Sequence, residues 1–246
     1  MIREPDIQAL ANQFWERVGR IAPYPRNLWV PAQRAFPVTI RQINGLSVDH
    51  VYAELSSIGY SDPPYTPDRK LRGCLVALQG YGIIFVDADD PREEKCFSLA
   101  HEASHFIIDH WRPREAVRQS ISPNTLEVFD GEREPTVVER FKGIRTGVAI
   151  RPFEHFMDRD QDGNIRMASL LFAENKADRL ALELLAPALE VVRKQRCATR
   201  AFSGKEIAGV LIRDFGLPAS VATSYGSFLF SKYIPEPSLR KRFGMK

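Results

Sequence analysis

The sequence predicts an α+β fold in which a short β-hairpin precedes a long helix and helices dominate the rest of the chain. Residues 72–87 are rich in β-branched and apolar side chains and are interrupted by glycines, as in a hairpin. Apolar residues recur at helical spacing before that segment and again from residue 169. Strands confined to one stretch of a mostly helical chain are typical of an α+β protein.

Residues 1–66 are predicted to form a helical and proline-rich segment that packs on the core. Apolar side chains recur every three or four residues from Ile7 to Val18, which predicts the first helix. Four prolines between residues 23 and 37 are expected to keep the next stretch extended. A second amphipathic helix is expected over residues 47–58, with Ser47 as its N-cap.

The hairpin leads into the helix that matters most for function. Gly80-Tyr81-Gly82 separates the two apolar runs and is predicted to form the turn. Asp90 then supplies an N-cap, Pro91 suits the first helical position, and Glu93 places an acid in the first turn. These signals predict a helix over residues 91–110.

The central domain is expected to span residues 67–196, with a long insert at 112–168. The insert is polar and broken by prolines and glycines, although residues 136–141 and 147–153 have strand-like composition. A strong helical pattern returns at residues 169–186 and ends near a proline. The sequence therefore returns to helix after the insert.

Residues 197–246 are predicted to form a C-terminal helical segment resembling a helix-turn-helix. Helices are expected at 203–216 and 218–230, after another at 188–196. The last of these is almost uncharged, whereas a DNA-reading helix presents Arg, Lys, Asn or Gln to bases and phosphates. This pattern favours packing onto the core, or docking a partner protein, over DNA binding.

Bulk composition narrows the class of protein further. The 246 residues carry a net charge of only +3, so contact with nucleic acid is not expected. The three cysteines are far apart, which argues against a disulfide framework and a thiolate metal site. The charged N-terminus lacks a signal-peptide core, and the apolar runs are too short to span a membrane. A cytoplasmic protein is expected; its oligomeric state is left open.

The segment His101-Glu102-Ala103-Ser104-His105 indicates a catalytic zinc site. Residues four apart on a helix share one face, so His101 and His105 can direct two imidazole nitrogens at one metal ion. Glu102 lies beside the first histidine, where its carboxylate can take a proton from a water at the metal. We expect one Zn²⁺ per chain, with Glu102 as the general base.

The third zinc ligand is expected to be Glu174. Zinc peptidases of the glutamate type take this ligand from a second helix, and an Asp four residues later often accepts the N–H of the first histidine. Glu174 and Asp178 have this spacing, so Asp178 is expected to orient His101. Asp109, or an acid of the insert, is the alternative third ligand.

One further motif has a simpler explanation. Residues 158–165 copy the first eight positions of a calcium-binding loop, but Ser169 stands where a bidentate Glu is required. A turn rich in Asp and Gly accounts for the same composition. Calcium binding is therefore not expected.

Four motifs together resemble the ImmA/IrrE family of bacterial zinc metallopeptidases. They are L-R-G-C-L-V-A, G-I-I-F-V-D, F-S-L-A-H-E-A-S-H-F-I-I-D-H and E-x-x-A-D-x-L-A-x-x-L-L-A-P. The resemblance covers roughly residues 67–110 and 169–190. The stretch of about 60 residues between the two site motifs is longer than the family usually has.

This resemblance implies a zincin-like fold with a gluzincin-type site. By position, His101, His105 and Glu174 would hold zinc and Glu102 would act as the base. The implied activity is site-specific cleavage of an intracellular regulatory protein, such as a transcriptional repressor. The alternative is a metal-stabilised regulatory module that binds protein or DNA without turnover.

Overall fold

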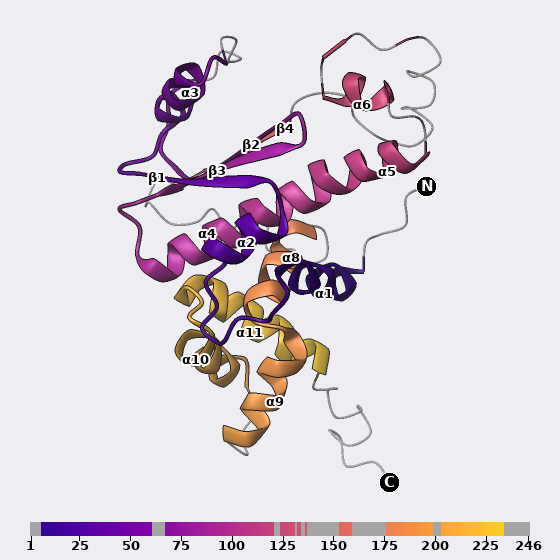
Figure 1. Cartoon of the computed structure of the whole chain (residues 1–246). Coiled ribbons are helices and arrows are strands. Elements are labelled where there is room, and N and C mark those ends of the chain that lie inside the picture. The colour runs from indigo at the N-terminus through magenta and orange to yellow at the C-terminus, as the bar shows by residue number, and fades with distance from the viewer. Residues whose placement is uncertain are drawn as a thin grey trace. The chain divides into compact units, whose positions relative to one another are not determined.

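The computed structural model describes residues 6–60, 67–120, 124–130, 132–133, 136, 153–158, 176–198 and 203–233. Within these ranges, helices make up most of the chain and four strands form a small sheet (Figure 1). The predicted α+β class is confirmed. No helix in the described ranges is long and apolar enough to cross a membrane.

The four described strands pair in the order β1-β3-β2-β4. They are β1 (Val38–Ile43), β2 (Leu71–Leu78), β3 (Tyr81–Asp87) and β4 (Phe153–Asp158). β2 is antiparallel to both of its neighbours, whereas β1 runs parallel to β3. The predicted hairpin β2–β3 therefore forms the centre of the sheet, and the two outer strands come from distant parts of the chain.

The hairpin turn lies one residue earlier than expected. Leu78 pairs with Tyr81, which leaves Gln79 and Gly80 as a two-residue loop, and Gly82 belongs to β3. Both loop residues have positive φ, 49° and 82°. Such a loop matches the right-handed twist of the strands, because a type I′ turn needs positive φ at both central positions.

Helix α1 (Ile7–Val18) confirms the first predicted helix. Asp6 caps its start, since the carboxylate accepts hydrogen bonds from the backbone N–H groups of Gln8 and Ala9. Gly19 adopts a left-handed conformation at its end, with φ 82°.

The stretch at 23–37 is not wholly extended, which corrects the prediction based on its prolines. It contains helix α2 (Trp29–Ala35), with Pro31 as the third helical residue. The first four N–H groups of a helix have no intrahelical acceptor, so a proline costs nothing there. The sequence prediction also missed β1, although its β-branched residues begin directly after Pro37.

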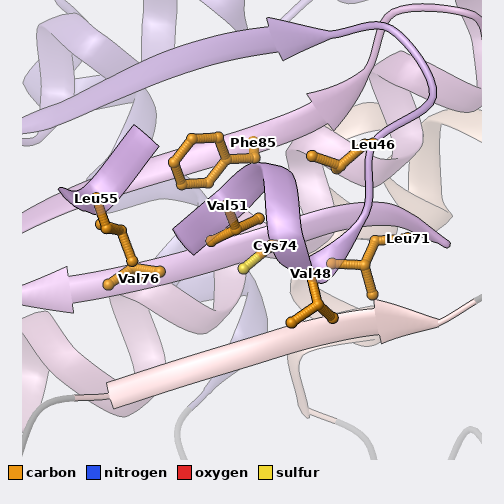
Figure 2. Close-up of a cluster of buried hydrophobic side chains, with 8 residues drawn as sticks. All are labelled: Leu46, Val48, Val51, Leu55, Leu71, Cys74, Val76 and Phe85. Carbon is orange, nitrogen blue, oxygen red and sulfur yellow. The ribbon is translucent and has the colours of Figure 1, made fainter. Parts of the chain in front are cut away.

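Helix α3 (Val48–Ser57) packs on one face of the sheet. Figure 2 shows its apolar side chains against those of β2 and β3. The buried cluster consists of Leu46, Val48, Val51, Leu55, Leu71, Cys74, Val76 and Phe85. Ser47 occupies the N-cap position, but its hydroxyl lies 3.2 Å from Nδ1 of His50, and the carboxylate of Asp68 accepts the N–H of Asp49 at 3.1 Å.

Helix α4 (Arg92–His105) packs against β2 and β3 from the other face (Figure 1). The predicted helix begins one residue later than expected, because Pro91 and not Asp90 occupies the N-cap position and no side chain caps the start. It also continues beyond residue 110. A π-helix, η1 (Phe106–Trp111), follows α4 directly, and α5 (Arg112–Ser120) continues from it. π-Helical turns are rare and occur frequently at functional sites.

The expected insert thus contributes regular structure to the domain. Besides α5 it holds a short helix, α6 (Asn124–Phe129), and strand β4. This strand begins at the last residue of the run at 147–153. The rest of that run, and all but residue 136 of the run at 136–141, lie outside the described residues. β4 pairs with β2, so the insert supplies an outer strand of the sheet.

The chain divides into two compact units. The first combines Met1–Ala22 with Asn27–Ala181, and the second combines Pro23–Arg26 with Leu182–Lys246. This division differs from the three segments expected at 1–66, 67–196 and 197–246. The N-terminal segment joins the first unit because β1 pairs with β3 and α3 packs on β2.

The second unit contains the helices expected near the C-terminus. They are α9 (Ala188–Ala198), α10 (Gly204–Phe215) and α11 (Ala219–Tyr233), preceded by the end of α8 (Lys176–Leu185). Helices α10 and α11 cross closely, since a Cβ atom on Gly226 would lie 2.6 Å from the carbonyl oxygen of Gly204.

Candidate metal centre

Helix α4 brings the two predicted histidines together. The ring centroids of His101 and His105 lie 4.7 Å apart, with 67° between the ring planes. His101 is buried and His105 is partly buried, so both rings stand at the edge of the core. Glu102, between them in sequence, has no exposed surface. The spacing of four residues produces this shared face, as expected for an α-helix.

A carboxylate from a distant helix holds His101. Oδ1 of Asp178 in α8 lies 2.7 Å from Nδ1 of His101. When Nδ1–H donates to a carboxylate, the neutral ring carries its lone pair on Nε2, the usual metal-binding nitrogen. The structure thus brings together two residues that are 77 positions apart and that the sequence analysis had paired. Their role beside a metal stays a prediction.

His105 is held in the same way by a nearer residue. Oδ2 of Asp109, in η1, lies 2.7 Å from Nδ1 of His105. From the sequence, Asp109 was expected only as an alternative third ligand, and its contact with His105 was not predicted. The spacing of four residues was the available signal, because such pairs meet on a helix surface. Bound to Nδ1, the Asp109 carboxylate lies on the side of the imidazole away from Nε2.

The predicted third ligand, Glu174, lies outside the described residues, two positions before α8 begins at Lys176. Within the described ranges, no three His, Cys, Asp or Glu side chains form a group that could hold a metal ion. Of the calcium-like motif, only Asp158 is described, as the last residue of β4. Glu174 therefore stays a prediction.

The described part of the site provides two imidazoles, which are donors of a kind that zinc accepts. The two rings lie beside each other on one helix, and each has its Nδ1 against a carboxylate oxygen. Histidines that bind zinc almost always donate their other ring N–H to such a partner. Together with one further carboxylate, these two rings would form a three-ligand site of the catalytic type.

A third histidine of this region takes no part in the pair. His110 is 2% exposed and its ring centroid lies 5.4 Å from that of Phe106. Burial lowers the pKa of His110 to about 4, although the carboxylate of Asp130 opposes this shift. The ring is therefore neutral at pH 7.

This lowered pKa predicts an acid-sensitive step in stability. Protonation of His110 is favoured in the unfolded chain, so its contribution to folding is complete above pH 6.5 and is lost as the pH falls towards 4. We expect the unfolding free energy of His110→Leu to fall less between pH 7 and 4.5 than that of the wild type. The difference should be on the order of 1 kcal/mol, after allowance for solvent screening. Urea unfolding at each pH measures this difference. If the unfolding free energies of the two proteins fell equally between pH 7 and 4.5, the lowered pKa of His110 would be contradicted.

Comparison of the chain with protein-family models, curated proteins and solved structures finds no match. The described residues of the candidate site are the two histidines, the two carboxylates at their Nδ1 atoms and the buried Glu102.

Proposed function

We propose that this chain is a zinc-dependent endopeptidase that cleaves a regulatory protein, such as a transcriptional repressor, in the cytoplasm. One observation carries the proposal: two imidazoles on adjacent turns of α4 lie edge to face beside each other, and each has a carboxylate at its Nδ1. Ordinary surface histidines need no such matched pair of partners. The resemblance of the motifs to the ImmA/IrrE family supports the choice of a protein substrate.

In this proposal His101, His105 and Glu174 hold one zinc ion. Bound zinc would supply Lewis acidity that lowers the pKa of water towards ~7 and polarises the scissile carbonyl. Asp178 and Asp109 keep Nδ1 of the two imidazoles protonated, which directs Nε2 of each ring at the metal.

Glu102 is the proposed general base. Its carboxylate follows the first histidine on α4 and is shielded from bulk solvent. In that position it takes a proton from the attacking water and later delivers it to the leaving amine nitrogen. The carboxylate must stay within hydrogen-bond reach of the water, because a general base acts only at such distances.

Metal content tests the proposal directly. Purified protein is expected to hold about one zinc per chain, measured by elemental analysis, because the proposed side chains form a single open site. His101→Ala should lose the metal. His50→Ala is the matched control, since His50 lies exposed on α3 and should leave zinc unchanged. Full zinc retention in His101→Ala would contradict the site.

Cleavage is tested in cells with the same protein. Wild-type and Glu102→Gln chains are expressed side by side, and new protein N-termini are identified by terminal labelling and mass spectrometry. A cut that appears with the wild type alone supports an endopeptidase and names its substrate. Zinc binding without any such cut would favour the metal-stabilised regulatory module.

A further inference from the structure

The face of α4 that meets the sheet carries a polar stripe. Glu94, Ser98 and Glu102 recur every four residues and so lie on one side of the helix. Ser98 and Glu102 have no exposed surface. A helix face buried against a sheet is normally apolar, so these polar residues require matching space or polar partners on the neighbouring strand.

A β-bulge in β2 lies opposite this stripe. Leu71 pairs with Asp158 of β4, yet Gly73 pairs with the preceding residue, Met157. Arg72 is therefore an extra residue in β2, without a counterpart on β4. Bulges interrupt the alternation of side chains between the two faces of a sheet, and they are common beside active sites, where they redirect side chains.

The bulge turns two consecutive residues towards α4. Nη1 of Arg72 lies 2.5 Å from Oε2 of Glu94, and Gly73 meets Glu102. Cys74, the next residue, belongs to the apolar cluster under α3 on the opposite face. Without the extra residue, Arg72 would share the face of Cys74, and the two contacts with α4 would not both form.

Gly73 leaves no room for a side chain. A Cβ atom there would lie 3.1 Å from Oε1 and 3.3 Å from Cγ of Glu102. It would also lie 3.5 Å from the carbonyl oxygen of Phe85, which is an ordinary contact. The tight neighbour of Gly73 is therefore the Glu102 side chain, and a methyl group at position 73 must displace it by a few tenths of an ångström.

We propose that Gly73 is a positioning residue: because it has no side chain, it leaves room for the Glu102 carboxylate next to the bulge of β2. This inference rests on the proposed function, in which Glu102 is the general base. A side chain at position 73 would crowd the place that the Glu102 side chain occupies beside β2. The position of this carboxylate matters, because a general base acts only within hydrogen-bond reach of the proton that it removes.

The role of Gly73 is tested by comparing the melting temperature of the full chain with and without Gly73→Ala, when residue 102 is Glu, Gln or Ala. Gly73→Ala should lower the melting temperature by roughly 2–4 °C when residue 102 is Glu, because the new methyl group crowds the Glu102 side chain. The loss should persist with Glu102→Gln, which has the same shape. It should nearly vanish with Glu102→Ala, whose empty space accepts the new methyl group.

Val76→Ala provides the matched control. Val76 lies on the same strand but faces the cluster under α3, so its loss should be equal in all three backgrounds. If Gly73→Ala lowered the melting temperature equally in all three backgrounds, Gly73 would not position Glu102. Zinc content separates this outcome from failure of the proposed function. If the effect of Gly73→Ala depends on residue 102 but the protein holds no zinc, the contact between Gly73 and Glu102 is supported and the peptidase is not. If the protein holds zinc but the effect of Gly73→Ala is the same in all three backgrounds, the proposed function is supported and the role of Gly73 is not.

Discussion

Glu102→Gln is expected to reduce cleavage by ~100- to 10,000-fold while leaving zinc binding nearly intact. The amide keeps the size and shape of the carboxylate, so the buried side chain still packs beside Gly73. An amide cannot accept the proton of the attacking water, and the loss therefore falls on the chemical step. Cleavage is followed under single-turnover conditions with the substrate found by terminal labelling, and zinc is measured on the same samples.

Glu94→Gln is the matched control for this experiment. Glu94 lies two turns earlier on the same face of α4 and pairs with Arg72, so its substitution changes a carboxylate of the stripe without touching the proposed base. We expect its cleavage rate to stay within a few-fold of the wild type. If Glu102→Gln cut the substrate as fast as Glu94→Gln, another residue would have to be the base.

The parts of the site that depend on local spacing were predictable from the sequence. His101 and His105 lie beside each other because four residues make about one helical turn. The same rule applies between His105 and Asp109, where the spacing was visible but was interpreted as a possible ligand. Helical periodicity extends over many residues, which makes helices such as α1 and α10 easy to recognise.

Features that depend on pairing between distant segments were not predictable in this way. β1 was missed because six residues give a weak periodic signal, and its parallel partner β3 lies more than 35 positions later. The bulge at Arg72 is invisible in the sequence, since it exists only relative to the register of β4. The Asp178–His101 contact was anticipated across 77 positions because Glu174 and Asp178 have the spacing of the third ligand and the orienting Asp in glutamate-type zinc peptidases.

Removal of the third ligand should weaken zinc binding more than removal of either orienting carboxylate. Glu174→Ala would leave two histidines to hold the metal, so affinity should fall steeply. Asp178→Ala and Asp109→Ala keep every proposed ligand but release one imidazole from its Nδ1 partner, which typically weakens binding ~10- to 100-fold. Affinities are measured by competition with a chromophoric chelator.

Two further variants make this comparison decisive. Asp178→Asn keeps an oxygen that can accept the N–H of His101 but removes the negative charge, so its zinc affinity should lie between those of the wild type and Asp178→Ala. Glu183→Ala alters an acid of the same helix whose carboxylate accepts the N–H of Ala188, and its zinc affinity should equal that of the wild type. If Glu174→Ala also matched the wild type while His101→Ala lost the metal, zinc would be present but the gluzincin-type site would be wrong. The third ligand would then be sought among the acids of the insert, because Asp109 is already engaged at Nδ1 of His105.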